Sequence, residues 1–577
     1  MASRLQPIYD IAEICAQKGV TEAVLCPGSR CAPLTVSFVR HPQINTRTFS
    51  DERSAAFIAN GIAQSKSEVV AMICTSGSAA YNFAPAVAEA FFQRIPVLIL
   101  TADRPKEWID QLDGQTIRQQ HIYGNHVKKS YELPDQYDHP DSVWHIHRTI
   151  NEAINLCNQF PQGPVHVNIP LREPLYLAEG EHIQFSDNIR ISDTLSVDYT
   201  LRESSLKPLA EQFISFNKII IVAGQQKLNI ELNTALEKFS DQHRVPVLAD
   251  IISNQHHLKE VINHSDVFLG ECKSDIKKSL QPELLITFGQ SVISKNLKTF
   301  LRQYKPKNHW HIQPDGHAPD TFQSLTTILP VSPLAFFQQL GTEKIKSGFE
   351  AQKRDNYYRL WEAEEHRTSR TVKTFFSAAQ LNEFSLVNEI INHLPDMCNL
   401  HLANSMPVRY ANYIGLQTEK KDIEIFANRG TSGIDGCVST TVGHALASDK
   451  PNILITGDMA FFYDRNAFWH NYNLSNLRVV VLNNHGGVIF SMIDGPSKLA
   501  EANDYFVTNQ KLSAKSLTQE FDFDYLKLDS LKKLKNILKD FFDFDGRTKI
   551  LEIESNSEEA KKTMNQFKNQ IRKNYDG

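Results

Sequence analysis

The sequence predicts an α/β protein with three consecutive doubly wound domains, each built on a parallel sheet. Its 577 residues are too many for one hydrophobic core. Short β-rich apolar runs alternate along the chain with longer segments of helical period, which is typical of βα units. Two polar stretches, 181–206 and 353–370, divide these runs into three sets. We therefore expect a first domain at residues 1–182, a central domain at 200–350 and a third domain at 371–577.

Each expected strand ends near glycine, serine, aspartate or proline. Because ligands of open α/β sheets bind beyond the carboxyl ends of the strands, a site is expected at these turns. We expect the stretch 353–370 to be a helix that leads into the third domain. The runs predicted as strands are 22–28, 69–77, 96–105, 164–170, 218–226, 245–251, 284–290, 309–316, 399–405, 423–430, 452–458, 478–487 and 549–555.

The composition argues against several classes of protein. The formal net charge of -5 gives no basic surplus for nucleic acid. Apolar runs such as 95–100 are far shorter than the ~20 residues that cross a bilayer, and the N-terminus lacks the apolar core of a signal peptide. The 8 cysteines are scattered without a C-x-x-C pair, which favours reduced thiols in the cytoplasm over a zinc site or a disulfide scaffold.

Two polar residues follow neighbouring runs of the third domain. Asp458 ends the run 452–458, and Asn484 stands 26 residues later (484 − 458), just before Gly486 and Gly487. Adjacent parallel strands would bring these turns together. A carboxylate, an amide oxygen and a glycine carbonyl are hard ligands that suit Mg²⁺, with phosphate oxygens and water completing its shell. The glycines let the backbone approach a phosphate, and a helix expected near Ser491 could direct its N-terminus there.

Taken singly, each of these residues has an ordinary alternative. Asp458 could be a helix cap and Asn484 a turn former. Their pairing favours the metal site and resembles the thiamine-diphosphate motif, G-D-G followed by N-N after some 25 residues. Here Met459 replaces the last glycine of G-D-G.

A thiamine enzyme also needs an acid on another domain. By this resemblance Glu52, at the start of an apolar helical run, is the partner of the aminopyrimidine N1′ and promotes formation of the ylid that attacks a 2-oxo acid. The alternative is a first-turn glutamate that complements the helix dipole. The segment "TSGSAAYN" (75–82) resembles the second pyrimidine-side signature, with Thr75, Ser76 and Gly77 at its turn.

Several cations follow expected strands. Arg30, Arg104, Lys295, Arg409 and Arg429 all stand at such positions. Single cations there are often surface residues, but arginines that converge on a cleft indicate bidentate binding of carboxylates.

Together these segments resemble the 2-succinyl-5-enolpyruvyl-6-hydroxy-3-cyclohexene-1-carboxylate synthase family over essentially the whole chain. "PGSR", "DER", "TADRP", the "NS…R" segment and "NRGTSGIDG" occur in family order. The resemblance implies a transferase of menaquinone biosynthesis. Such an enzyme decarboxylates 2-oxoglutarate on thiamine diphosphate and adds the succinyl-semialdehyde carbanion to isochorismate in a 1,4 addition. It also implies Mg²⁺ or Mn²⁺, and a homodimer or homotetramer whose active sites lie between subunits.

The resemblance assigns roles to matching residues. The metal ligands would be Asp458, Asn484 and the Gly486 carbonyl. The catalytic residues would be Glu52, Arg30, Gln115, Lys295, Ser405, Arg409 and Arg429. The substrates would contact Ser29, Arg30, Arg104, Gln115, Lys295, Ser405, Arg409, Arg429, Ile489 and Phe490. The cofactor would contact Glu52, Thr75, Ser76, Gly77, Ile434, Gly457, Asp458, Met459, Asn484, Gly486, Gly487 and Ile489.

Some residues depart from the family pattern. Cys31 and Ala32 replace the more usual Ser-Thr, Gly114 stands where asparagine is common, and Asn296 follows Lys295 where a second cation can occur. These departures leave the reaction class intact and bear on the binding of isochorismate.

Two other functions stay open from the sequence. One is a decarboxylase or carboligase of the acetohydroxyacid-synthase type, against which Arg30, Arg409 and Arg429 count. The other is a catalytically silent protein with the same fold, against which Glu52, Asp458 and Asn484 count. The central domain's "VAGQQKLN" lacks G-x-G-x-x-G spacing, so we predict no flavin or nicotinamide.

Overall fold

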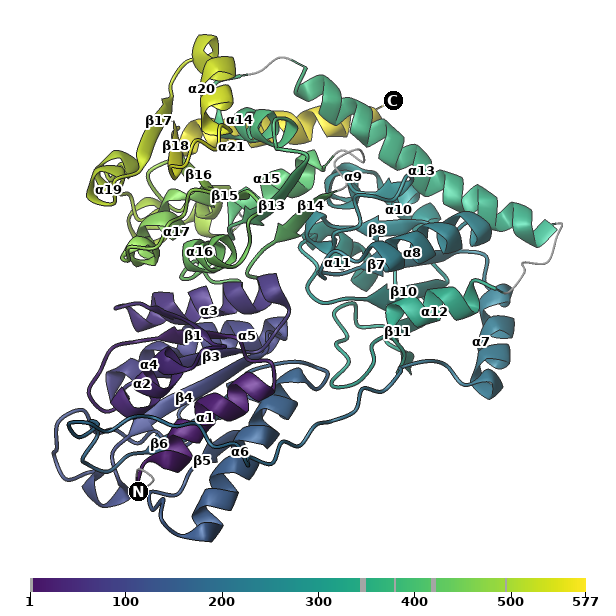
Figure 1. The fold of residues 1–577 in the computed structure, drawn as a ribbon. Helices are drawn as coiled ribbons and strands as arrows, with labels where there is room; N and C mark the ends of the chain where they lie inside the picture. The colour runs from purple at the N-terminus through teal and green to yellow at the C-terminus, as the bar shows by residue number, and fades with distance from the viewer. Residues whose placement is uncertain (1–3, 343–348, 378–379, 417–421, 493–494, 577) are drawn as a thin grey trace.

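Three six-stranded sheets, parallel throughout, form the framework (Figure 1). The strands of these sheets lie within 22–170, 219–329 and 397–554. The predicted fold class is therefore confirmed, while the domain boundaries stay predictions. The computed structural model describes residues 4–342, 349–377, 380–416, 422–492 and 495–576.

The first sheet has the strand order β2-β1-β3-β4-β6-β5. Its central strands β3 and β4 are buried throughout, as expected for a parallel sheet covered on both faces. Its strands are β1 (Glu22–Leu25), β2 (Asn45–Thr48), β3 (Val70–Cys74), β4 (Val97–Asp103), β5 (Ser130–Glu132) and β6 (Val165–Pro170). Its helices are α1 (Gln6–Gln17), α2 (Ala32–Arg40), α3 (Glu52–Lys66), α4 (Ser78–Asn82), α5 (Ala84–Gln93) and α6 (Pro140–Asn158).

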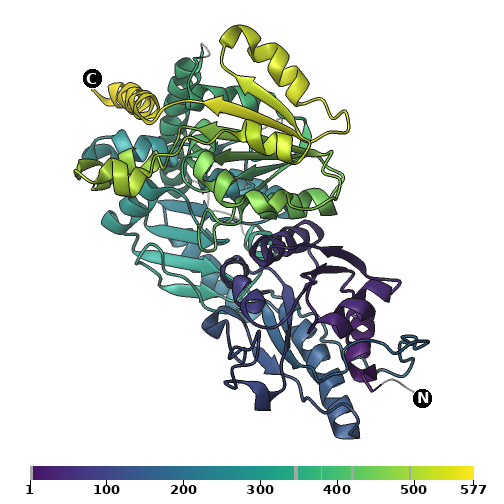
Figure 2. The same ribbon diagram turned by 90° about the vertical axis from the view of Figure 1, so that its left-hand side faces the viewer.

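The central sheet has the order β12-β11-β10-β7-β8-β9. Its strands are β7 (Ile219–Ala223), β8 (Val247–Ala249), β9 (Val261–Ile262), β10 (Leu284–Phe288), β11 (Asn308–Ile312) and β12 (Thr327–Leu329). Its helices are α7 (Glu203–Ser215), α8 (Ile230–His243), α9 (Ser265–Glu271), α10 (Ser274–Leu280), α11 (Lys295–Gln303) and α12 (Pro333–Leu340). The long helix α13 (Phe349–Phe375) then spans from this domain to the third, as the sequence predicted (Figures 1 and 2).

The third sheet has the order β14-β13-β15-β16-β18-β17. Its strands are β13 (Met397–Leu402), β14 (Asp422–Phe426), β15 (Asn452–Gly457), β16 (Leu477–Asn483), β17 (Asp524–Leu528) and β18 (Lys549–Glu554). Its helices are α14 (Glu383–Asn392), α15 (Met406–Ile414), α16 (Cys437–Ala447), α17 (Asp458–Tyr463), α18 (Ile489–Met492), α19 (Ala514–Glu520), α20 (Leu534–Phe541) and α21 (Ser557–Arg572). The helix expected near Ser491 is only the four residues of α18.

The first and third domains share an apolar core through α3 and α16, which lie side by side in Figure 1. Gly61 and Gly443 permit this approach. A Cβ at Gly61 would lie 2.1 Å from the Thr440 carbonyl oxygen, and one at Gly443 would lie 2.1 Å from the Ile58 carbonyl oxygen. Because both obstacles are backbone atoms, only glycine fits at either position.

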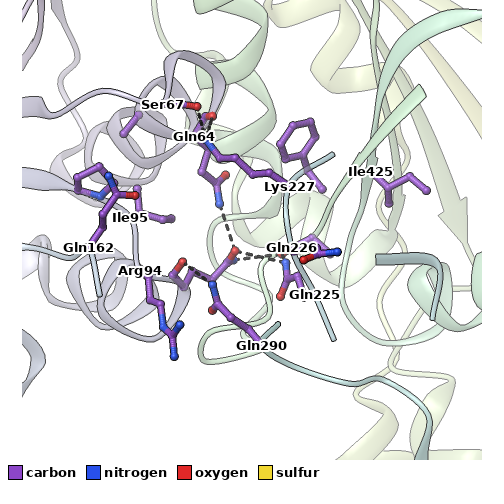
Figure 3. Close-up of a pocket in the computed structure, with 15 residues that line it drawn as sticks. Gln64, Ser67, Arg94, Ile95, Gln162, Gln225, Gln226, Lys227, Gln290 and Ile425 are labelled. Carbon is purple, nitrogen blue, oxygen red and sulfur yellow. Dashed lines mark hydrogen bonds between the residues drawn. The ribbon is translucent and has the colours of Figure 1, made fainter. Parts of the chain in front are cut away.

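All three domains meet around Gln93, beside a cavity of about 80 Å³ (Figure 3). The Gln93 side-chain oxygen accepts hydrogen bonds from Gln64 (3.2 Å) and from Gln225 of the central domain (3.4 Å). Its amide nitrogen donates to the Ala427 carbonyl of the third domain (3.1 Å). This polar junction fixes the third domain relative to the other two. Among the described helices, none combines the length and apolar character needed to cross a membrane.

Candidate active site

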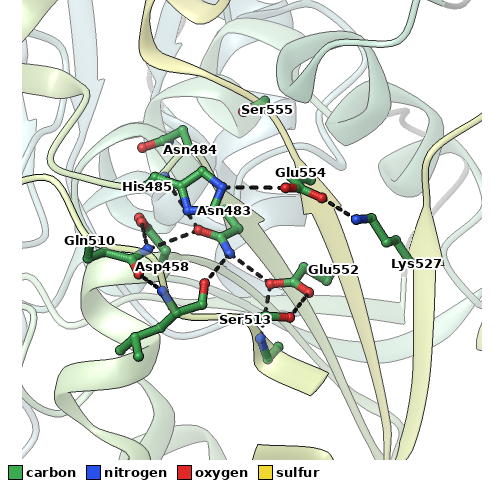
Figure 4. A network of polar contacts seen from close by, with 12 residues as sticks. Asp458, Asn483, Asn484, His485, Gln510, Ser513, Lys527, Glu552, Glu554 and Ser555 are labelled. Atoms are coloured by element: carbon green, nitrogen blue, oxygen red, sulfur yellow. Dashed lines mark hydrogen bonds and ion pairs between the residues drawn. The ribbon is translucent and has the colours of Figure 1, made fainter. Parts of the chain in front are cut away.

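Asp458 and Asn484 lie at the edge of the third sheet that is formed by the carboxyl ends of its strands. The strands β15 and β16 are adjacent and parallel, with Gly457 opposite Leu482, so the turns that follow them are neighbours. Asp458 is the first residue of α17, and its carboxylate accepts a 2.6 Å hydrogen bond from Gln510 Nε2 (Figure 4). Gln510 Nε2 also donates to the Asn483 side-chain oxygen (3.0 Å). No sequence motif marks Gln510.

The chemistry of this edge suits a divalent cation. Asn484 Oδ1 is buried and has no hydrogen-bond partner among the described residues. The Nδ2 group of the same amide donates to Glu383 (3.1 Å). Burial raises the pKa of Asp458, and a bound cation would offset that penalty. A Cβ at Gly486 would lie 2.8 Å from a Val507 side-chain atom, so the turn packs too closely for a side chain. These residues therefore fit the proposed metal set.

Met459 is compatible with this turn. It occupies the second position of α17, where the backbone is helical and needs no glycine, and its N–H bonds to the Asp458 carboxylate. The aromatic run after it faces the interior: Phe461 is fully buried, with its ring 6.2 Å from that of Phe468. Apolar packing therefore supports the turn.

Glu52 lies at the corresponding edge of the first sheet. It begins α3, whose N-cap Asp51 accepts from the Ser54 N–H, and its carboxylate accepts a long 3.4 Å hydrogen bond from Asn82. On the neighbouring turn the hydroxyls of Thr75 and Ser76 are buried without a described partner. These three predicted cofactor contacts are thus grouped at one edge, with polar atoms available to a ligand.

Arg30 and Arg104 form a pair of cations at the same edge. Arg30 donates to the Leu171 carbonyl (2.9 Å), and Arg104 pairs with Asp113 (3.0 Å). Burial and the charge of Arg104 lower the pKa of Arg30, which indicates that the two guanidiniums are close. Arg104 also donates to the Gly114 carbonyl (2.9 Å), so the backbone at Gly114 remains part of this cluster even though the family asparagine is missing.

Gln115 and Ser29 complete the predicted substrate contacts on this side. Gln115 has φ +57°, and its backbone lies 3.3 Å from the position of a Cβ on Gly77. Ser29 is exposed on the turn after β1, beside Gly28. A Cβ on Gly28 would lie 2.3 Å from Thr75, so the turns after β1 and β3 are in close contact.

A second arginine pair lies at the edge of the third sheet. Arg409 donates to the Ser405 carbonyl (2.5 Å), and Arg429 donates to Asn404 (2.8 Å) while its Nε is buried without a described partner. Burial and the charge of Arg409 lower the pKa of Arg429. Ser405 has φ +75°, a costly conformation for a residue with a side chain and one that is common at functional sites.

The central domain places a different lysine near this pair. Lys295 is exposed at the start of α11. Lys298, one turn further on, is partly buried, and the charge of Arg429 acts on its pKa, which burial lowers. The loop of Arg429 is itself held by buried Glu89 of α5, which accepts from the Gly430 and Thr431 N–H groups (2.9 and 2.6 Å). No motif marks Lys298 or Glu89, because their contacts arise between domains.

The two edges are not joined within one chain. Among the described residues, no hydrogen bond or ion pair links Glu52, Arg30 or Arg104 with Asp458, Asn484 or Arg409. The neighbours of Glu52 instead bond to the last residue of α17 and to the 3-10 helix that follows it (Arg465–Phe468). Arg53 donates to the Tyr463 carbonyl (2.9 Å), and Asp51 accepts from Asn466 (2.7 Å).

Comparison with known proteins identifies the class. The family model "Thiamine pyrophosphate enzyme, N-terminal TPP binding domain" matches residues 9–127, and "Middle domain of thiamine pyrophosphate" matches residues 197–402. The solved structure of benzoylformate decarboxylase from Polynucleobacter necessarius has the same fold, with a TM-score of 0.70 at 15% identity over 95% of this chain and 98% of that one. The fold and the site thus define a thiamine-diphosphate-dependent enzyme.

Curated relatives specify the family. The chain is 43% identical to a 2-succinyl-5-enolpyruvyl-6-hydroxy-3-cyclohexene-1-carboxylate synthase of Cytophaga hutchinsonii, over 99% of this chain and all of the relative. Relatives of the same name in Flavobacterium johnsoniae (37%, 94% of this chain and 95% of the relative) and Bacteroides fragilis (34%, 99% and 100%) agree. The chain belongs to the 2-succinyl-5-enolpyruvyl-6-hydroxy-3-cyclohexene-1-carboxylate synthase family.

Proposed function

We propose that the protein decarboxylates 2-oxoglutarate and transfers the remaining four-carbon unit to isochorismate by 1,4 addition, as a step of menaquinone biosynthesis. Both proposed substrates are dicarboxylates. The observation that carries this proposal is the two arginine pairs, Arg30 with Arg104 and Arg409 with Arg429, at the two sheet edges. Guanidinium groups bind carboxylates bidentately, and a small oxo acid with a single carboxylate would not need two pairs of arginines.

The cofactor would lie across the two edges. Asp458, Asn484 and the Gly486 carbonyl would hold Mg²⁺ or Mn²⁺ and, through it, the diphosphate. The unpartnered Asn484 Oδ1 supports this assignment. On the pyrimidine side the unpartnered hydroxyls of Thr75 and Ser76 are available to the cofactor. Thiamine diphosphate supplies the carbon nucleophile that takes up a 2-oxo acid and releases carbon dioxide.

Further cofactor contacts come from glycine turns and apolar side chains. Ile434 is 36% exposed although apolar, which supports its proposed contact with the cofactor. Gly487 donates its N–H to the Val507 carbonyl (2.7 Å), which fixes the turn before Ile489. The remaining proposed contacts are Gly77, Gly457 and Met459.

Glu52 would exchange a proton with N1′ of the aminopyrimidine. Its carboxyl group stands at the strand ends, half-buried, where one oxygen accepts only a long hydrogen bond from Asn82. The group is therefore free to bind a ring nitrogen and to hold a proton there.

The substrates would be held by polar groups from all three domains. One carboxylate of each substrate would meet an arginine pair, and Phe490, which is 38% exposed, would offer an apolar wall together with Ile489. The other proposed contacts are Ser29, Gln115, Lys295 and Ser405.

A second copy of the chain would complete each site. The lack of a hydrogen bond or ion pair between the site residues of the two edges, among the described residues, supports this. So do the exposed apolar side chains of Tyr81, Trp108 and Leu112 in the first domain and of Ile434 and Phe490 in the third. We propose a homodimer as the minimum unit and a dimer of dimers as the assembly. The 8 free cysteines, all buried, support a location in the reducing cytoplasm.

The test incubates the protein with Mg²⁺, thiamine diphosphate, 2-oxoglutarate and isochorismate, and follows the product by mass spectrometry. The expected product has the mass of both substrates less carbon dioxide. Pyruvate in place of 2-oxoglutarate serves as the control and should give little product. Preferred turnover of pyruvate would instead assign the chain to smaller oxo acids.

A further inference from the structure

Glu383 is a buried carboxylate beside the proposed metal site that the mechanism above does not use. It is the first residue of α14 and is 1% exposed. No basic side chain pairs with it among the described ion pairs. Since an unpaired buried carboxylate is costly unless hydrogen bonds satisfy it, this position calls for an explanation.

Three donors from three segments converge on Glu383. The Tyr410 hydroxyl, on α15, donates to Oε1 (2.5 Å). The Ser555 hydroxyl, just after β18, donates to Oε2 (3.0 Å), and Asn484 Nδ2, just after β16, donates to the same oxygen (3.1 Å). The carboxylate is thus satisfied by neutral groups, and one of them is a proposed metal ligand.

The contact with Asn484 decides which way its amide faces. An amide presents an acceptor on one side and a donor on the other, and only the oxygen can bind a cation. Burial raises the pKa of Glu383, and the hydrogen bonds from Tyr410, Asn484 and Ser555 act in the opposite direction by favouring the ionised form. An ionised carboxylate accepts and cannot donate, so Glu383 holds the Nδ2 side of Asn484. The Oδ1 side therefore faces away from Glu383 and is the buried, unpartnered atom of the site.

We propose that Glu383 is a positioning residue that fixes the amide of Asn484 with its oxygen toward the cation. This inference rests on the proposed metal site. Residues that orient a ligand in this way typically contribute about 10–100-fold to metal affinity. The same contact would also disfavour an aspartate at position 484, because two carboxylates would then repel each other.

The test measures Mn²⁺ affinity by electron paramagnetic resonance of the free ion, with thiamine diphosphate present and without substrates. Glu383→Met removes the acceptor at similar volume. Glu364→Met is the matched control, because Glu364 is also a buried glutamate (7% exposed) that accepts from a tyrosine, Tyr575 (2.7 Å), but it lies on α13. We expect about 10–100-fold weaker Mn²⁺ binding for E383M and an unchanged affinity for E364M.

A second background separates orientation from stability. In Asn484→Asp both side-chain oxygens can bind the cation, so orientation no longer matters. Adding Glu383→Met to N484D should therefore not weaken Mn²⁺ binding, and it should strengthen it by relieving repulsion. Equal losses in both backgrounds, or wild-type affinity in folded E383M, would overturn the proposal.

Two further results keep the outcome clear. If E383M does not fold, N484D is compared with N484D/E383Q, in which the glutamine amide can donate to the new carboxylate. We expect roughly tenfold tighter binding in the double variant, and equal affinities would refute the role of Glu383. If the wild-type chain itself binds no Mn²⁺ in the presence of thiamine diphosphate, the proposed metal site fails, independently of Glu383.

Discussion

Glu52 carries the most specific chemical role proposed for any single residue. Glu52→Gln preserves the shape of the side chain but removes the carboxyl group that would exchange a proton with N1′. We expect kcat to fall by roughly 10²–10⁴, the usual contribution of a general acid or base, while the affinity for thiamine diphosphate changes little. Steady-state kinetics and calorimetric titration of the cofactor measure the two quantities. The control is Glu68→Gln, an exposed glutamate just beyond the C-terminal end of α3. Normal turnover in E52Q would remove Glu52 from the mechanism.

Arg409 and Arg429 offer a second test at the scale of residues. Because both follow β13 and β14 and not the strands β15 and β16 that lead to the metal turns, Arg409→Ala and Arg429→Ala should each raise the KM of the oxo acid or of its acceptor. The expected increase is about 10–100-fold, from the loss of hydrogen bonds to a charged group worth roughly 1.5–3 kcal/mol. Cofactor affinity should be unaffected. Arg302→Ala, exposed on α11, is the control. A change confined to cofactor binding would contradict the assignment.

At the scale of elements, the contact between α3 and α16 depends on two glycines. Gly443→Ala would place a methyl group against the Ile58 carbonyl oxygen, which cannot move without shifting α3. We expect a loss of roughly 1–3 kcal/mol or more in the free energy of unfolding, measured by urea denaturation. Gly270→Ala on α9 is the control, because the nearest atom there belongs to the Asn296 side chain. Because a side-chain amide can shift where backbone cannot, and because alanine is the better helix former, we expect a smaller loss for this control than for Gly443→Ala. Equal effects of both changes would show that helix propensity, not the contact, decides.

The elements also explain what the sequence could predict. Every predicted run contains a strand. Except for β14, these are inner strands with a neighbour on both sides, and inner strands of parallel sheets are buried on both faces and rich in apolar residues. Five strands were missed, and each is an outermost strand of its sheet: β2, β5, β9, β12 and β17. There one side of the strand has no neighbour, and β2 and β5 are exposed or half-buried, so no apolar run marks them. The polar segment 181–206, which divides the first two sets of runs, has no helix or strand up to α7, but it buries Ile189 against the first domain.

The same reasoning applies to the site. Asp458 and Asn484 could be paired from sequence because each follows a strand and β15 and β16 are neighbours. Glu383 could not, since it contacts Asn484 from 101 residues away and its own helix has no motif. Contacts of this kind depend on how α14 packs on the sheet, which periodicity does not specify. Gln510, Lys298 and Glu89 were missed for the same reason.

At the scale of the whole molecule, the separation of the two sheet edges predicts complementation between subunits. Glu52→Gln inactivates the first-domain edge, and Asp458→Ala inactivates the third-domain edge. If each site is built from two chains, a mixed dimer contains one site with both residues intact and one site with neither. Random reassortment of equal amounts should then restore about one quarter of wild-type activity, although each variant alone is inactive.

The experiment requires that subunits exchange, so the two variants are co-expressed with different affinity tags and the doubly tagged species is purified. That species should have about half the activity per site of the wild type, because one of its two sites is intact. A chain carrying both E52Q and D458A, paired with the wild-type chain, is the matched control. Each of its two sites would contain one substituted residue, so it should be inactive. Activity in this control together with an inactive E52Q–D458A pair would mean that each site is formed within a single chain, and that the contact through α3 and α16 rearranges to close it.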